Sequence, residues 1–149
     1  NVKVPTMTSD TAPSGVASAS SSYSSNLPWK AFDDVRSSAW ISTETANAWI
    51  QYEFPYAVCV NKFTFADREI DQYHRVVAAH LKASNDGINF TNLLDFNTPS
   101  DSSILNFVVT NTTKYKYYRI LFDSYNDDMS SVGGGKGTMC YVFQTYGRA

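Results

Sequence analysis

The spacing of the apolar residues constrains this chain more than any other feature. No long segment places apolar residues at positions i, i+3, i+4 and i+7, whereas short alternating, β-branched or aromatic runs recur along the sequence. Each run is bounded by Gly, Pro, Asn, Asp or Ser, which are the residues that favour turns. The pattern predicts an all-β protein.

The runs predict about eight antiparallel strands. We expect these strands at residues 15–21, 49–54, 58–66, 76–84, 89–96, 104–109, 116–122 and 139–146. A chain of 149 residues is close to the usual size of one domain, and two separate cores would be cramped within it. We therefore predict one domain over residues 1–149, built as a β-sandwich of two sheets.

The connections between the runs also carry information. Asn85-Asp86-Gly87 tolerates positive φ angles and predicts a tight β-hairpin between two runs. Residues 18–26 and 123–138 are polar and poor in strand formers, so we expect loops there. The second segment contains Lys136 among glycines, but Gly137 follows it where a phosphate-binding loop needs Ser or Thr opening a helix.

Charge and hydropathy exclude several kinds of partner. The formal net charge is −2 and the twelve Lys and Arg residues are scattered singly, so there is no basic field for nucleic acid. No stretch is long and apolar enough for a membrane span, and the polar N-terminal residues lack a signal-peptide layout. We expect a protein that binds neither nucleic acid nor a bilayer core.

The two cysteines, Cys59 and Cys140, have no CxxC spacing and no neighbouring ligand pair, which excludes a standard zinc motif. Both lie in apolar alternating runs, which favours two buried free thiols. A disulfide between them remains the alternative, provided that the first and last parts of the sheet meet.

The inventory of titratable residues argues against an enzyme. General acid–base catalysis needs a tuned carboxylate, histidine or nucleophile in a shielded pocket, and His74 and His80 are the only histidines. His80 lies within an expected strand, which favours a structural or solvent-facing role. His74 lies in the charged stretch 67–75, which is either a solvated connection or part of a recognition loop.

Several short motifs, in this order along the chain, resemble one known family. They are Ala31-Phe32-Asp33-Asp34, Ala39-Trp40, Trp49-Ile50-Gln51-Tyr52-Glu53-Phe54, Ala83-Ser84-Asn85-Asp86-Gly87 with Phe90, and Phe143-Gln144-Thr145-Tyr146-Gly147. Their succession over about residues 12–147 resembles the discoidin or coagulation factor 5/8 type C superfamily, which includes the family 32 carbohydrate-binding modules. The resemblance implies a galactose-binding-like jelly-roll sandwich without catalytic machinery, whose ligand is held by loops at one end.

The resemblance also implies which loops line a sugar site. The projected residues are Tyr23, Asn26 and Trp29 in a first loop, Arg68, Asp71 and His74 in a second, and Tyr125, Asn126 and Asp127 in a late loop. Sugar recognition needs directional polar groups for hydroxyls and an aromatic face for the apolar side of the ring. We expect Arg68 and His74 to donate, Asn126 to donate and accept, and Tyr23 or Tyr125 to stack, whereas Trp40 and Trp49 are expected in the core.

Family members frequently hold a structural calcium ion beside the segment that corresponds to residues 31–38. Calcium takes six to eight oxygen ligands, and the resemblance assigns the Asp33 carboxylate, a carbonyl of Lys30 or Ala31, and oxygens of Arg36 or Ser38. Val142 stands where many members have a glutamate, and Asp34 stands where they have glycine. The alternative is that Asp33 only caps the turn through its own backbone.

The expected function is therefore that of a lectin-like module that attaches a larger extracellular, cell-surface or phage-tail protein to galactose-type or other hexose glycans. The alternative is a protein-binding or structural adhesion domain within a multimeric surface or virion assembly. Lipid binding is disfavoured, because Leu27 and Trp29 in the first loop have only Lys30 as a nearby cation.

Overall fold

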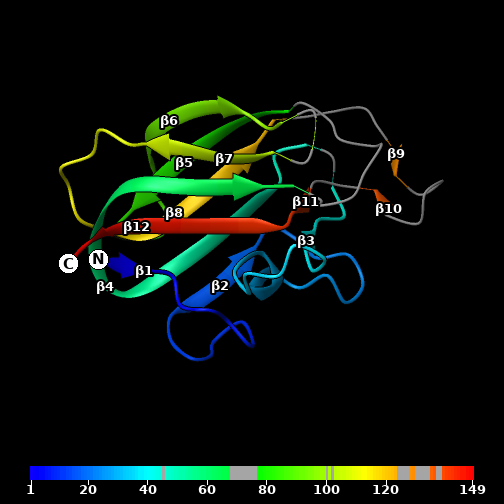
Figure 1. The fold of residues 1–149 in the computed structure, drawn as a ribbon, viewed down its shortest axis with the longest axis horizontal. Helices are drawn as coiled ribbons and strands as arrows, with labels where there is room; N and C mark the ends of the chain where they lie inside the picture. Colours follow the sequence, from blue (N-terminus) through cyan, green and yellow to red (C-terminus); the bar gives the residue numbers. More distant parts are fainter. Residues whose placement is uncertain are drawn as a thin grey trace.

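The computed structural model describes residues 1–44, 46–67, 77–99, 101, 103–123, 128–129, 135–136 and 139–149. These residues form strands and one short 3-10 helix (Figure 1). In chain order the elements are β1 (Val2–Lys3), β2 (Val16–Ala19), η1 (Pro28–Ala31), β3 (Trp40–Ile41), β4 (Trp49–Ala66), β5 (Ala78–Ser84), β6 (Thr91–Asn97), β7 (Ile104–Val108), β8 (Tyr115–Phe122), β9 (Asp128–Met129), β10 (Gly135–Lys136), β11 (Met139–Cys140) and β12 (Val142–Arg148).

The long strand β4 belongs to both layers of a β-sandwich. Its first half pairs with β2 and β8, and the sheet continues from β8 through β5 to β6; we call this the back sheet. Its second half pairs with β12 and β7, and β1 pairs with β12; this is the front sheet, nearest the viewer in Figure 1. Every pairing is antiparallel, so the predicted all-β sandwich is confirmed.

Two of the predicted strand boundaries are wrong, for a physical reason. The separate runs 49–54 and 58–66 are one strand that changes sheet at a register shift between Glu53 and Val58, around Pro55. The single run 139–146 is divided at Tyr141, because Met139–Cys140 pairs with β3 and the rest pairs with β4. Both boundaries depend on which strands pair, and a local sequence pattern does not specify the pairing partners.

The core lies between the sheets and is rich in aromatic rings. The inward residues of β4 and β8 alternate along each strand, with Ile50, Tyr52 and Phe54 facing the buried side of the back sheet. Phe63 on the front sheet links the layers, because its ring centroid lies 4.9 Å from Phe107, 5.2 Å from Phe96 and 6.3 Å from Phe143. These ring contacts fix how the two sheets face each other.

The predicted hairpin joins β5 to β6, but its connection is wider than a tight turn. Residues 84–90 lie between the paired residues Ala83 and Thr91. Gly87 has φ +75°, and the Asp86 Oδ1 atom accepts the N–H groups of Ile88 and Asn89, each at 2.8 Å. These hydrogen bonds to the charged carboxylate lower the pKa of Asp86 well below its usual value.

The two chain ends lie side by side, since Val2 pairs with Gly147 across β1 and β12. Figure 1 shows both ends on the left, whereas β3 and β11 lie toward the right. No helix among the described residues is long and apolar enough to cross a membrane. Cys59 and Cys140 are both buried and free, so the disulfide alternative is not realised.

Candidate ligand-binding site at the loop end

The described flanks of the three projected loops meet at the end of the sandwich opposite the chain termini. The start of β4, the end of β8 and the start of β5 are adjacent there, and so are the end of β4 and the start of β12. Three backbone hydrogen bonds join these flanks: Phe122 N–H to Ala48 O (2.9 Å), Asp123 N–H to Ala78 O (2.8 Å) and Tyr141 N–H to Ala66 O (3.1 Å). The topology therefore brings together loops that are far apart in sequence.

The first loop is fastened to β3 and presents Tyr23. The Tyr23 N–H donates to the Ile41 carbonyl at 2.7 Å, and the Ile41 N–H donates to the Asn26 carbonyl at 3.4 Å. The Asn26 side-chain amide donates one N–H to the Tyr23 carbonyl at 3.0 Å, and no other described residue bonds it. This leaves the Asn26 Oδ1 atom as an acceptor beside Tyr23, and Tyr23 is 39% exposed.

Trp40 anchors the same loop from inside the core. It is fully buried, as predicted, and its Nε1–H donates to the Ser21 carbonyl at 2.8 Å. The Ser21 hydroxyl in turn accepts the Thr43 N–H at 2.9 Å. A core aromatic therefore sets the position of a surface loop two residues from Tyr23.

Most of the projected sugar-binding residues lie outside the described residues. These are Arg68, Asp71, His74, Tyr125, Asn126 and Asp127. Trp29 of the first loop is described and half-buried, packed against the core with the Lys30 ammonium 5.6 Å from its ring centroid. Of the projected set, the structure thus places Tyr23 and Asn26 together and turns Trp29 toward the core.

An unpredicted histidine–carboxylate bridge lies at the base of the late loop. On β5, the His80 Nδ1 atom lies 2.6 Å from Asp95 of β6, and its Nε2 atom lies 3.0 Å from Asp123, just after β8. The hydrogen bond to Asp95 raises the pKa of His80, burial opposes it with a smaller effect, and the bond to Asp123 adds a further rise. His80 therefore has the structural role that its strand position predicted, but its partners come from other strands.

Trp49 does not lie in the core, which corrects the prediction for that residue. It is half-buried on the outer face of the back sheet, because Ile50 and not Trp49 faces inward at the start of β4. The Arg119 guanidinium lies between its ring and that of Phe90, at 3.8 Å and 4.0 Å from the two centroids. Gln51 fixes this guanidinium by accepting its Nε–H at 2.9 Å.

The segment projected to hold calcium follows η1, and Asp33 lies within it. Asp33 is buried at 9% exposure, and its Oδ1 atom accepts the Val35 N–H at 3.0 Å, so it caps the turn. Asp34 holds a left-handed φ of +61°.

Other features of this loop reduce its fit to calcium. The Arg36 guanidinium extends to the Asp67 carbonyl at 2.9 Å, so this cation ties the loop to the end of β4. Ser38 donates its N–H to the Val35 carbonyl at 3.1 Å. No group of three or more His, Cys, Asp or Glu among the described residues is arranged to hold a metal. Of the projected ligands, the structure therefore shows one buried carboxylate, that of Asp33, which caps the turn.

Comparison with protein families gives one match. A sequence model of the F5/8 type C domain matches residues 16–133, which is well over half of the chain. A search of curated protein sequences returns no match.

Solved structures share the fold at low sequence identity. The module CpGH89CBM32-5 from Clostridium perfringens, in complex with GalNAc-β-1,3-galactose, has a TM-score of 0.73 and 21% identity over 89% of this chain and 94% of that one. The CBM32 of AlyQ, in complex with 4,5-unsaturated mannuronic acid, has a TM-score of 0.71 and 16% identity over 88% and 93%. The family 32 module of Clostridium perfringens NanJ, in complex with galactose, has a TM-score of 0.71 and 13% identity over 88% and 92%.

Proposed function

This chain belongs to the F5/8 type C domain family, and we propose that it is a carbohydrate-binding module that holds a glycan at the loop end of its sandwich. The domains of this type bind ligands and do not catalyse, so the chain is not an enzyme. The site is accordingly one of recognition, and its residues need complementarity to a ligand and no reactive group.

One observation carries the proposal: the first loop presents an aromatic side chain and a free amide acceptor together, where the flanks of two further loops meet. Tyr23 is 39% exposed, and the Asn26 amide bonds only to the Tyr23 carbonyl among the described residues. An aromatic face for sugar C–H groups beside a directional acceptor for a hydroxyl is the chemistry that a hexose requires. Arg68, His74 and Asn126 supply further polar groups in this proposal.

We propose a galactose-type hexose as the ligand. The support is that two of the compared modules were solved with galactose or a galactose-containing disaccharide. A monosaccharide in a shallow loop site buries few atoms, so we expect a dissociation constant of ~0.1 to 1 mM.

The test is a glycan array probed with the multimerised domain and with three variants. Tyr23→Ala removes the proposed stacking ring, and the Arg68→Ala/His74→Ala double variant removes two proposed donors. Tyr56→Ala is the matched control, because Tyr56 is 53% exposed where β4 changes sheet, at the opposite end of the sandwich. Circular dichroism establishes that each variant is folded.

We expect discrete glycan hits that are kept by Tyr56→Ala and lost by the other two variants. Hits that survive in Tyr23→Ala and in the double variant would place the site elsewhere. An array without hits would refute the glycan proposal and favour protein recognition or a structural role.

We also propose that the turn around Asp33, between η1 and β3, binds a calcium ion weakly. The ion would neutralise the buried Asp33 carboxylate and stiffen this turn. Asp33→Asn tests this directly, because asparagine keeps the Oδ1 acceptor for Val35 and loses the charge. We expect millimolar calcium to raise the melting temperature of the wild type over that in chelator, and to leave Asp33→Asn unchanged. An equal response of the two proteins would contradict a metal at Asp33.

We propose that the module acts outside the cell or on a virion, as part of an assembly that presents several copies. The support is the weak affinity that we expect of a single site. Several copies whose loop ends face one surface bind with greater avidity than one copy does. Immunolabelling of intact cells or particles tests this, and labelling that requires permeabilisation would contradict it.

A further inference from the structure

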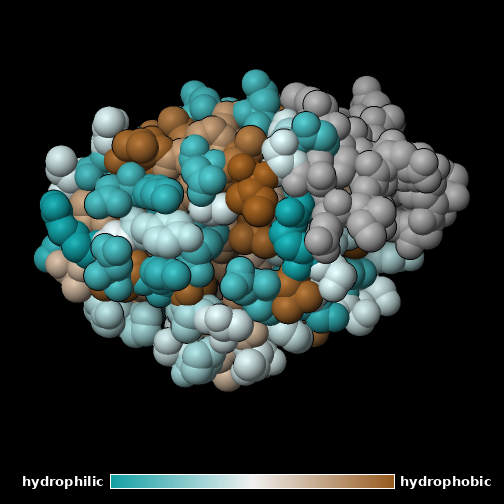
Figure 2. All heavy atoms as spheres, in the orientation of Figure 1, coloured by the Kyte–Doolittle hydropathy of each residue, from teal (hydrophilic) through white to brown (hydrophobic). Residues whose placement is uncertain are grey.

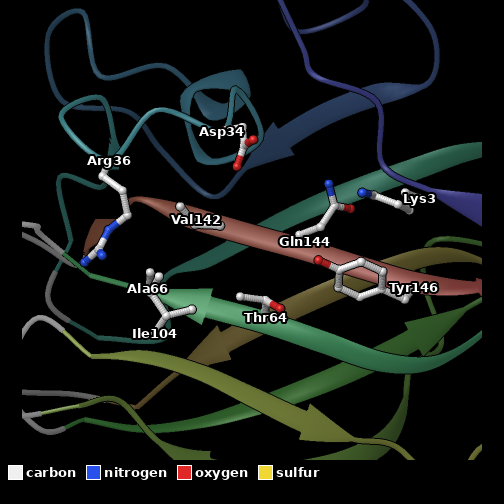
Figure 3. A pocket seen from close by; sticks show the side chains of 9 residues that line it. All are labelled: Lys3, Asp34, Arg36, Thr64, Ala66, Ile104, Val142, Gln144 and Tyr146. Carbon is white, nitrogen blue, oxygen red and sulfur yellow. The ribbon is translucent and has the colours of Figure 1, made fainter.

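The front sheet carries a groove on its outer face, away from the tips of the loops. It has a volume of about 260 Å³ and lies over β12 and the second half of β4 (Figure 3). Val142 pairs with Ala66, which pairs with Ile104, so three small or aliphatic side chains stand in one row across the sheet. In Figure 2, which faces this sheet, hydrophobic atoms near the centre are bordered by hydrophilic ones.

Polar side chains from three segments surround this floor. Asp34 and Arg36 overhang it from the loop after η1, Gln144 lies on β12, and Thr64 lies on β4 (Figure 3). The Gln144 side chain is fixed by two hydrogen bonds of 3.0 Å to the backbone N–H and carbonyl of Val4. The groove therefore offers a rigid mixture of donors, acceptors and apolar surface.

The charge of the groove is positive, although the whole chain is acidic. Lys3 and Lys62 hold their ammonium groups 5.3 Å and 5.0 Å from the ring centroid of Tyr146, which closes one end of the groove. Arg36 lines the other end of the groove. Asp34 is the acidic side chain among the lining residues. Asp67, which follows the end of β4, is only 8% exposed, and its backbone carbonyl accepts the Arg36 guanidinium at 2.9 Å.

We propose that this groove is a second saccharide site, separate from the loop end, and that it takes an acidic sugar such as a uronic acid unit. The small apolar floor suits the C–H face of a pyranose ring, and the exposed Asp34 carboxylate and the second Nε2–H of Gln144 suit its hydroxyls. The Lys3 ammonium offers a charge-assisted hydrogen bond to a carboxylate, and the Arg36 guanidinium, which donates to the Asp67 carbonyl, adds positive charge at the other end of the groove. The volume of about 260 Å³ lies just below the roughly 300 Å³ at which ordinary ligand pockets begin, so we expect the groove to hold only part of an oligosaccharide.

The test is isothermal titration of the domain with tri-galacturonic acid, with neutral galactose-bearing oligosaccharide titrated in parallel. Ile104→Glu places a negative charge at the edge of the floor, and the side chain is 52% exposed, so folding should be kept. Ile88→Glu is the matched control, because it makes the same change at an 81% exposed position in the β5–β6 hairpin of the back sheet. Lys3→Gln removes one cation of the lining.

We expect saturable binding of tri-galacturonic acid that weakens about tenfold in Ile104→Glu, severalfold in Lys3→Gln and less than about twofold in Ile88→Glu. Raising salt to about 0.5 M should weaken it further, since the attraction is electrostatic. The neutral oligosaccharide should bind Ile104→Glu as it binds the wild type, which separates this site from the loop-end site.

Three results would overturn the proposal. Absence of tri-galacturonic acid binding to the wild type refutes the groove's ligand class, whatever the neutral sugar does. Equal weakening by Ile104→Glu and Ile88→Glu means that only the overall charge matters. Loss of tri-galacturonic acid binding in Tyr23→Ala, with Ile104→Glu unaffected, assigns the acidic sugar to the loop end.

Discussion

Gly15 occupies a position that no other residue can fill without a shift of the core. Its φ is +71°, and a Cβ atom there would lie 2.1 Å from the Tyr52 hydroxyl oxygen and 2.6 Å from the Glu53 carbonyl oxygen. The Tyr52 hydroxyl donates to the Ser14 carbonyl at 2.9 Å, so moving the ring also breaks a hydrogen bond of a buried side chain.

We therefore predict that Gly15→Ala lowers the free energy of unfolding by about 2–4 kcal/mol. Gly87→Ala is the comparison, because its φ is also positive at +75° but its Cβ would lie 3.2 Å from the Tyr117 ring. We expect it to cost only about 1 kcal/mol. Urea unfolding measures the free energy of unfolding of both variants. Equal losses would contradict the prediction, because they would mean that the Tyr52 ring moves away from the added Cβ atom at little cost.

His80 makes stability depend on pH in a defined direction. Its pKa is raised in the folded protein, so its contribution is fully present below the unfolded value of 6.5 and is lost as pH rises through the folded pKa. The pKa of Asp95 is lowered, chiefly by the bond to His80, so its contribution is lost only as pH falls through that lowered value. Lys82 on β5 and Asn92 on β6 also face Asp95 and favour its charged form.

We predict that His80→Gln destabilises the protein more at about pH 5.5 than at about pH 8.5. The difference should be small, because Asp95 and Asp123 are 69% and 50% exposed and solvent screens the bridge. Urea unfolding of both proteins at the two pH values measures it. A larger loss at the higher pH would contradict the direction of the His80 shift.

At the scale of an element, the back sheet carries an interaction that ties β4 to β8 and to the β5–β6 hairpin from outside. Trp49 opens β4, Arg119 lies on β8, and Phe90 ends the connection before β6. Burial lowers the pKa of Arg119 without threatening its charge, so the guanidinium remains a cation between two rings.

We predict that a double-mutant cycle of Arg119→Ala and Trp49→Leu gives a coupling free energy of about 0.5–2 kcal/mol. Arg119→Lys should recover little of the loss, because an ammonium cannot stack flat between two rings. Denaturant unfolding of the four proteins supplies the cycle. Additive effects of the two changes would mean that the stack contributes only apolar burial.

Trp49 shows the limit of assigning burial within a strand from a sequence motif. Trp49 was assigned to the core because the family motif has an aromatic there, but an alternating strand buries either its odd or its even residues. Ile50, Tyr52 and Phe54 face the core, so Trp49 lies on the outer face of the sheet. In residues 49–54 the even set is entirely apolar or aromatic, whereas the odd set contains Gln51 and Glu53, so the alternation alone favours the even set and the family motif misplaces Trp49.

For the whole molecule, the position of the termini decides how the module can be presented. The ends lie together at one end of the sandwich, and the flanks of the projected ligand loops meet at the other. A fusion at the C-terminus should therefore leave the loop end unobstructed.

We predict that fusing a parallel trimeric coiled coil after the last residue raises apparent affinity for a galactose-bearing surface about 100-fold or more over the monomer. Surface plasmon resonance at high ligand density measures it, with a low-density surface as the control on which the gain should shrink. An unchanged apparent affinity at high density would contradict the proposed orientation of the loop end.

The sequence by itself determined the strand content, the β5–β6 hairpin and the burial of both cysteines. Each of these depends on properties that neighbouring residues carry: a period of two, a turn residue with positive φ, or an apolar run around a cysteine. The ordered motifs added the family, and the family model confirms it over residues 16–133.

Only the tertiary structure decided which distant residues meet. His80 finds Asp123, 43 positions away, and Gln144 finds Val4, 140 positions away, because the strands that carry them are adjacent in the fold. The groove likewise combines β1, β12, β4, β7 and the loop after η1. Such contacts depend on strand order and register, and a local sequence pattern encodes neither, because any strand with the right period can pair with any other.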